Sequence, residues 1–191
     1  MALDNYRGTL PEEQLGGDVE NHIKAFFIAR IKNILSEEGV RYDVIDAALN
    51  GEWRILPILE ERAKALMAMR KDQAFAQLLT GFTRAYNLAK KSEETAVDPN
   101  ILEDPAEKRL YESLQNVGER LTQLSSEAVS ESSYIQVIQV LSQLAEPVNA
   151  FFDAVMVMSE DLKLRDSRIG LLKRMVELSS KFIGDLSKIT D

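Results

Sequence analysis

The 191-residue chain carries 31 acidic and 23 basic residues, a formal net charge of −8, with one histidine and no cysteine. The lack of cysteine excludes disulfides, thiolate nucleophiles and cysteine-ligated zinc. A single histidine, His22, leads us to expect neither a histidine-based triad nor a multi-histidine metal site. Neither a signal-peptide pattern nor a membrane-length apolar run occurs, so we expect a cytoplasmic location.

The first part of the chain indicates a linker followed by helices. Residues 1–17 contain the pair Gly16-Gly17 and are interpreted as the linker. Asp18 is a candidate N-cap for a helix that ends before Gly39, because glycine suits the left-handed residue after a helix. A short helix is predicted over residues 43–49.

Two further helices are predicted before an acidic segment. Pro57 suits the first turn of one helix, where its missing N–H costs little. Asp72 is a candidate N-cap for the next, which is expected to end near Lys91. Residues 92–104 are acidic and contain proline, so they are interpreted as a loop between two sub-bundles.

The second part of the chain also indicates helices only. Residues 104–107, Asp-Pro-Ala-Glu, combine an N-cap, an N1 proline and an N3 glutamate, which predicts a helix start. Serine-rich residues 125–133 predict a turn. Residues 134–158 predict a helix that Pro147 must kink or divide, and the last helix is expected to begin within 161–166.

These elements together predict an all-α fold of about seven to eight helices, since no segment alternates with a period of two. The expected organisation is a linker over 1–17, sub-bundles over 18–91 and 105–191, and the acidic loop over 92–104. We expect the two sub-bundles to form one domain.

A cluster of basic residues suggests contact with phosphates despite the acidic net charge. Residues 80–91 contain Arg84, Lys90 and Lys91 but no acidic residue. Arg84, Asn87 and Lys91 have i, i+3, i+7 spacing and share one helix face. An amide between two cations suits phosphate binding and base-edge recognition. The alternative interpretation is an ordinary solvated helix face.

The last helices contain a second set of candidates. Arg165 and Arg168 are three residues apart at the start of the final helix, and the alternative there is a salt bridge within the bundle, for example to Asp153. Phe151 and Phe152 cannot point the same way on a helix. Core packing is favoured for both, and stacking of one on an unpaired base is the alternative.

Several segments resemble the bacterial glycyl-tRNA synthetase β subunit. Residues 144–172 contain Pro-Val, then Phe-Phe-Asp-x-Val-Met-Val-Met, then an Arg-x-x-Arg helix, and so resemble the closing signature of that family. Residues 26–31, 44–49 and 82–91 resemble three of its other helical motifs. In the last of these, Thr83 and Ala85 stand where the family has lysine and valine.

The resemblance implies a C-terminal fragment that forms a helical, DALR-type anticodon-binding domain. It implies tRNA-Gly as ligand and, as partners, the α subunit and the rest of β in an α2β2 enzyme, with no membrane or DNA. The parent would be a glycine–tRNA ligase, whereas this fragment would be non-catalytic and hold no cofactor or metal, because ATP, Mg and glycine bind the α subunit. The expected tRNA-binding residues are Arg84, Asn87, Lys90, Asn149, Arg165 and Arg168, with Arg30 as a weaker backbone contact.

The sequence leaves two alternatives open. One is the C-terminal anticodon module of arginyl-tRNA synthetases, and the other is a helical adaptor that binds protein and no RNA. We also expect Arg84→Ala or Arg168→Ala to weaken tRNA binding without unfolding the chain.

Overall fold

The structure, a computed structural model, describes residues 17–49, 56–90, 96–125 and 130–190. These residues contain helices, turns and loops but no strand, which confirms the all-α prediction. The chain divides into two compact units, residues 1–40 and residues 41–191. Among the helices of these described ranges, none is both long enough and apolar enough to cross a membrane.

The first unit contains one described helix, α1 (Gly17–Glu37). Gly39 has a φ of +86°, and the N–H of Val40 donates to the carbonyl of Leu35 at 3.0 Å, so glycine terminates the helix as predicted. Asp18 lies inside α1 rather than before it, which corrects its assignment as N-cap. Several large apolar side chains of α1 are exposed, namely Ile23, Phe26 and Phe27.

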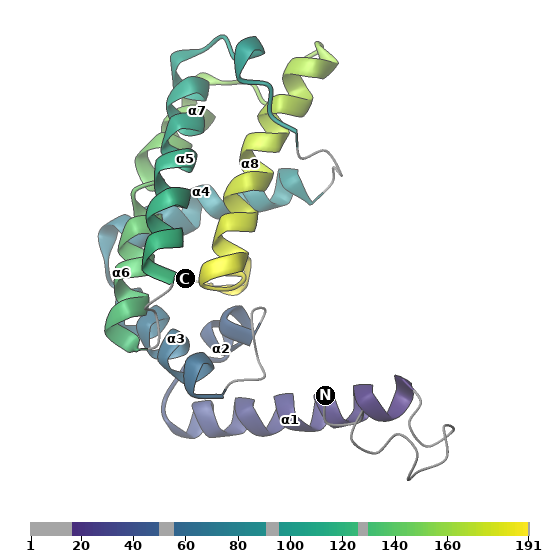
Figure 1. Ribbon diagram of the computed structural model, residues 1–191, viewed down its shortest axis with the longest axis vertical. Helices are drawn as coiled ribbons and strands as arrows, with labels where there is room; N and C mark the ends of the chain where they lie inside the picture. Colours follow the sequence, from purple (N-terminus) through teal and green to yellow (C-terminus); the bar gives the residue numbers. More distant parts are fainter. Residues whose placement is uncertain (1–16, 50–55, 91–95, 126–129, 191) are drawn as a thin grey trace. The chain divides into compact units, whose positions relative to one another are not determined.

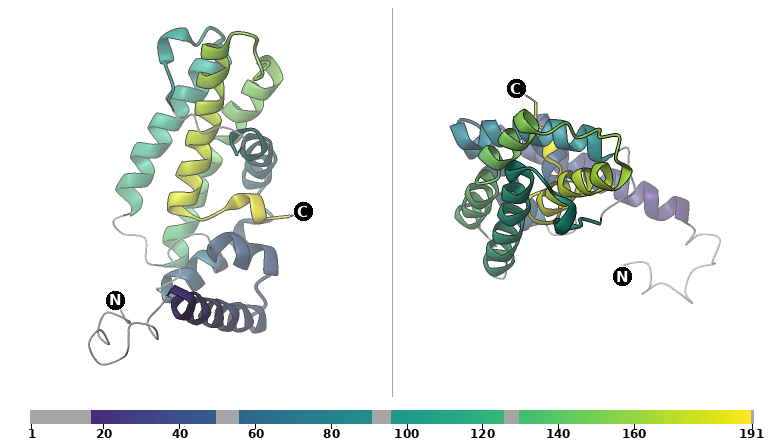
Figure 2. Two further views of the ribbon diagram at one scale, coloured as in Figure 1. Left: turned by 90° about the vertical axis from the view of Figure 1, so that its right-hand side faces the viewer. Right: turned by 90° about the horizontal axis from the view of Figure 1, so that it is seen from above.

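The second unit contains the remaining helices (Figures 1 and 2). They are α2 (Tyr42–Leu49), α3 (Leu56–Met69), α4 (Gln73–Ala89), α5 (Pro105–Ser125), α6 (Glu131–Ser142), α7 (Ala145–Ala154) and α8 (Leu162–Phe182), with the 3-10 helices η3 (Pro99–Ile101) and η4 (Leu186–Lys188). α5 and α8 follow the long direction of this unit, whereas α4 runs across them (Figures 1 and 2).

Side-chain caps set several helix starts where the sequence placed them. The Asp72 carboxylate accepts from the N–H of Phe75 at 2.9 Å and begins α4. Asp161 caps α8 in the same way. At α5, Asp104 accepts from the N–H of Ala106, while Glu107 accepts from the N–H of Asp104 at 2.9 Å. The capping box predicted for residues 104–107 is therefore confirmed.

Pro147 explains why the helix expected over residues 134–158 is two helices. α6 ends at Ser142 and α7 begins at Ala145, so proline is the third residue of α7. In the first turn of a helix the missing N–H has no intrahelical partner to lose. α7 also ends at Ala154, four residues before the expected end, because Val155 adopts an extended conformation.

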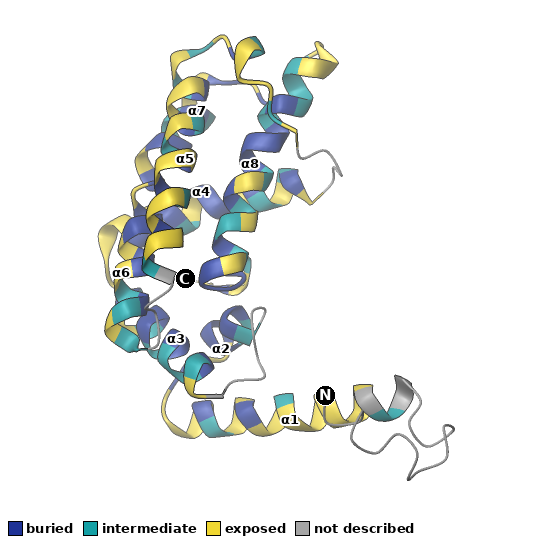
Figure 3. Ribbon diagram, viewed as in Figure 1, coloured by how far each residue is buried: buried dark blue, intermediate teal, exposed yellow. Residues whose placement is uncertain are grey.

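The core of the second unit forms where α4 packs against α6, α7 and α8. Phe75, Leu78 and Phe82 of α4 are fully buried, as is Phe151 of α7, whereas α5 presents a largely exposed outer face (Figure 3). The acidic segment at 92–104 lies within this unit in the chain, and helices from both sides of it pack together.

A buried carboxylate joins the two ends of the second unit. Asp43 at the start of α2 is 1% exposed, and it accepts hydrogen bonds from Arg41, from Arg70 at the end of α3, and from the N–H and hydroxyl of Thr190. Burial alone raises the pKa of Asp43, but the hydrogen bonds from Thr190 and Arg41 outweigh this effect and lower the pKa to about 2.

Asp43→Asn is expected to lower the free energy of unfolding at pH 7 by about 2 kcal/mol, because the folded-state pKa lies below its ordinary value of 3.8. The contribution of the carboxylate is complete above pH ~4 and is lost as the pH falls towards ~2. Urea titrations from pH 7 to pH 2.5 should show the difference between wild type and variant shrinking below pH ~4. Glu112→Gln, an exposed control on α5, should leave the curve unchanged. If the stability difference between wild type and Asp43→Asn stays constant with pH, the lowered pKa of Asp43 in the folded state is contradicted.

Candidate nucleic-acid interface

The candidate site lies where α4 crosses α7, and a glycine allows this crossing. A β-carbon on Gly81 would lie 2.4 Å from Cγ1 of Val148 and 3.3 Å from Oδ1 of Asn149. Valine is branched at Cβ and cannot move its methyl group without rotating into another rotamer. Gly81 therefore lets the two helices approach more closely than any other residue would.

The close crossing brings Arg84 of α4 onto Phe152 of α7. The guanidinium carbon lies 4.1 Å from the centroid of the Phe152 ring, while the Arg84 side chain is exposed and Phe152 is half-buried. Phe151 is fully buried and meets Phe152 edge to face, with ring centroids 5.5 Å apart. Core packing is thus confirmed for Phe151, whereas Phe152 supports an arginine at the surface.

Asn87 lies one turn after Arg84 on the same face of α4, and Lys90 is the residue that directly follows the helix. Both side chains are exposed. The Lys90 ammonium donates to Oδ1 of Asn87 at 2.8 Å and lies 5.4 Å from the centroid of the Tyr86 ring. α4 contains no acidic residue. Of the two acidic residues of α7, Glu146 is paired with Arg109 at 2.7 Å and Asp153 is exposed.

Asn149 connects α7 to α4 through its side-chain amide. Its Nδ2 donates to the carbonyl of Ala145 at 2.8 Å and to the carbonyl of Gln77 at 3.4 Å. Of the expected set, Arg84 and Asn149 thus lie at the crossing together with Phe152, and Asn87 and Lys90 follow Arg84 towards the end of α4. We call these five residues the α4–α7 surface.

Arg168 makes its contacts within the helical bundle and does not belong to the α4–α7 surface. Its Nε donates to Glu107, which is fully buried, and its NH1 donates to the carbonyl of Met156 at 2.8 Å. The other carboxylate oxygen of Glu107 caps α5 through the N–H groups of Glu103 and Asp104. A salt bridge within the bundle, the alternative considered for Arg168, is present, with Glu107 rather than Asp153 as partner.

Three other residues that the sequence singled out are not part of the α4–α7 surface. Arg165 is on the first turn of α8, with its Nε 3.7 Å from Asp166, and about a third of its side chain is exposed. Arg30 is exposed on α1, in the first unit. Lys91 lies outside the described residues.

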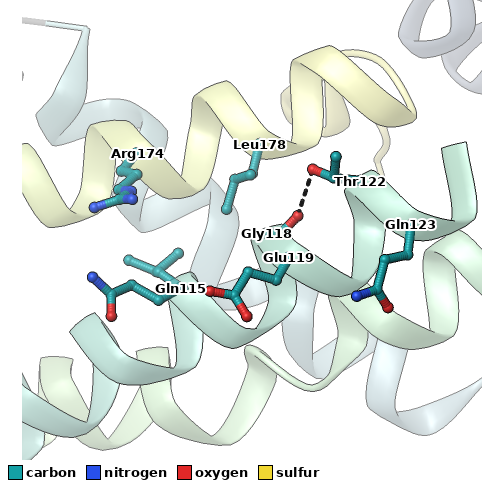
Figure 4. A pocket seen from close by; sticks show the side chains of 8 residues that line it. Gln115, Gly118, Glu119, Thr122, Gln123, Arg174 and Leu178 are labelled. Carbon is teal, nitrogen blue, oxygen red and sulfur yellow. Dashed lines mark hydrogen bonds between the residues drawn. The ribbon is translucent and has the colours of Figure 1, made fainter.

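A separate groove of about 650 Å³ lies between α5 and α8 (Figure 4). Gln115, Glu119 and Gln123 line it from α5, and Arg174 and Leu178 line it from α8. The charged residues that line it are one carboxylate and one guanidinium, so the lining has no excess of positive charge to attract phosphates. None of its residues belongs to the α4–α7 surface.

The all-helical chain matches a known class of anticodon-binding domain. The model of the DALR anticodon binding domain family matches residues 78–181, and the chain belongs to that family. The matched range runs from α4 to the end of α8 and contains every residue of the α4–α7 surface.

Among curated proteins, the chain is similar to glycine–tRNA ligase β subunits, which confirms the resemblance inferred from the sequence. It is 36% identical to the β subunit of Desulforudis audaxviator and 35% identical to that of Desulforamulus reducens, over 98% of this chain in both cases. It is 33% identical to the β subunit of Moorella thermoacetica over 90% of this chain. The chain spans about a quarter of the length of these relatives.

Several features of the structure leave little or no signal in the sequence. Arg84 and Phe152 are far apart in the chain, and no local pattern indicates that they stack. Gly81 carries only a weak signal, because a glycine inside a strongly periodic helix implies a close packing contact without naming the partner. The sequence pattern indicates that Glu107 caps a helix, but nothing in it indicates that the same carboxylate binds Arg168.

Arg168→Ala is expected to lower the free energy of unfolding, and not to change RNA binding alone. Removing one member of a buried ion pair leaves the Glu107 charge unpaired and costs about 3–5 kcal/mol. Arg165→Ala is the matched control and should change stability by less than about 0.5 kcal/mol, because that ion pair is exposed and long. Thermal and urea denaturation of both variants check this, and equal stability of the two would contradict it.

Gly81→Ala should destabilise the second unit by about 1–3 kcal/mol, because overpacking forces α7 away from α4. Gly118→Ala is the matched control on α5. Its β-carbon would lie 3.5 Å from Leu178, an ordinary contact, so this change should be neutral or stabilising by up to about 1 kcal/mol through helix propensity. Urea denaturation distinguishes the two, and a tolerated alanine at position 81 would refute the close crossing.

Proposed function

We propose that this chain is the tRNA-binding part of a glycine–tRNA ligase β subunit and that it binds the anticodon region of tRNA-Gly through the α4–α7 surface. The observation that carries the proposal is the exposed guanidinium of Arg84, stacked on Phe152 beside Asn87 and Lys90 on a helix without acidic residues. Membership of the anticodon-binding family supports it.

The chemistry of this surface suits unpaired RNA. Arg84 and Lys90 offer charge to phosphates, and a guanidinium plane also stacks on a splayed base. Phe152 holds the guanidinium in place, so less side-chain entropy is lost on binding than for a free arginine. Asn87 and Asn149 add hydrogen-bonding groups that can contact base edges.

In this proposal the chain acts by position and not by chemistry. The ATP-dependent glycylation of tRNA-Gly belongs to the whole enzyme, with the reaction on the α subunit, and this domain holds the tRNA in register. Arg165 is proposed as a further tRNA contact and Arg30 as a weaker backbone contact, since both side chains are at least partly exposed. Arg168 contributes by holding the start of α8.

Arg84→Ala should weaken binding of a tRNA-Gly transcript roughly ten-fold while leaving the melting temperature unchanged, because the side chain is exposed. The slope of log Kd against log salt should fall by about one. Filter binding over a salt series measures both quantities. Arg174→Ala, which removes an exposed arginine from the α5–α8 groove, is the control and should keep wild-type affinity.

Each outcome separates the alternatives. An equal loss of affinity in Arg174→Ala would move the site to the groove. Unchanged affinity in a folded Arg84→Ala variant would remove the α4–α7 surface as the site. Absence of tRNA binding by the wild-type chain would favour the protein-binding adaptor, and equal affinity for a tRNA with an altered anticodon would exclude anticodon recognition.

A further inference from the structure

The partners of Asn87 and Asn149 fix which way each side-chain amide points. Lys90 contacts Asn87 at 2.8 Å, and an ammonium group can only donate, so the atom that faces it is the Asn87 oxygen. The Asn87 nitrogen, with two N–H groups, therefore points away from Lys90. Asn87 presents hydrogen-bond donors to a ligand.

Asn149 has the opposite polarity. Its amide faces the carbonyl oxygens of Ala145 and Gln77, which can only accept, so the atom that faces them is the nitrogen. Both N–H groups are used there. Its Oδ1 lies beside Gly81 of α4 and accepts no hydrogen bond within the part of the chain that the structure describes. Asn149 presents an acceptor.

Arg84 lies between these two amides along α4. Asn149 contacts α4 at Gln77 and beside Gly81, whereas Arg84 and Asn87 follow Gly81 by three and six residues. Six residues of helix span about 9 Å, which exceeds the roughly 3.4 Å separation of stacked bases. The Asn149 acceptor and the Asn87 donors therefore contact different nucleotides, and the Arg84 guanidinium lies between them along α4.

We propose that Asn149 is a specificity-determining residue, whose Oδ1 accepts from the amino group of an unpaired base stacked on the Arg84 guanidinium. This inference rests on the proposed function and names what the same surface selects. The base is one with an exocyclic amino group, such as cytosine or adenine. Uracil at this position places a carbonyl oxygen against Oδ1, where two acceptors repel. Asn87 donates to a neighbouring phosphate or base acceptor and selects little.

The test compares base preference and not affinity alone. The 191-residue chain is titrated against a labelled anticodon stem-loop RNA of tRNA-Gly, and against RNAs in which each amino-bearing loop base is replaced in turn by uracil. Wild type should show one position at which uracil weakens binding about ten-fold. Asn149→Ala should bind that uracil RNA and the parent RNA within about two-fold of each other.

Two further variants separate a lost preference from lost folding. Asn149→Ser keeps a hydroxyl that can donate to the carbonyl of Ala145 and should melt like wild type while losing the preference. Asn116→Ala removes an exposed amide from α5 and should retain the preference. A ten-fold preference that persists in folded Asn149 variants overturns the inference, as does the absence of any uracil-sensitive position.

Failure of the proposed function has a different signature. In that case no RNA binds, or Arg84→Ala leaves affinity and salt dependence unchanged. RNA binding that depends on Arg84 but shows no preference dependent on Asn149 overturns only the present inference.

Discussion

Helix α4 can lie against α7 only because residue 81 has no β-carbon. The methyl group of Val148 occupies the space that any side chain at position 81 would need, at 2.4 Å from an added β-carbon. The contacts between α4 and α7 at the candidate site follow from this close approach. It brings the amide of Asn149 within reach of the Gln77 carbonyl and places Phe152 beneath the guanidinium of Arg84. If α4 and α7 were further apart, Arg84 would not contact Phe152 and Asn149 would not contact Gln77.

Two buried carboxylates hold the ends of the second unit in place. Asp43 connects the start of α2 to Arg70 and to Thr190 near the end of the chain. Glu107 connects the start of α5 to Arg168 of α8, and Arg168 in turn holds the carbonyl of Met156 in the connection between α7 and α8. Each carboxylate accepts several hydrogen bonds, which is the condition for a buried charge to be tolerated. These contacts position the helices that carry the surface without touching a ligand.

The acidic net charge does not prevent this molecule from presenting a cationic surface. Exposed charges are screened over about 8 Å at physiological ionic strength, so carboxylates on other faces contribute little at α4. What matters is the local composition, and α4 carries Arg84 with no acidic residue. On α7, the pairing of Glu146 with Arg109 neutralises one of two acids, and Asp153 remains the exposed carboxylate beside Phe152.

The sequence alone determined most of the helices, because their signals are local: the cap at Asp72, the capping box at residues 104–107, the glycine at position 39 and the apolar spacing all act within one or two turns. It also identified the family and the basic face of α4. Only the tertiary structure decided which candidates serve a site. Arg84 on Phe152, Asn149 on Gln77 and Arg168 on Glu107 are contacts between residues that lie 61 to 72 positions apart in the chain. Such pairings depend on how closely helices pack, and no local pattern of residues encodes that distance.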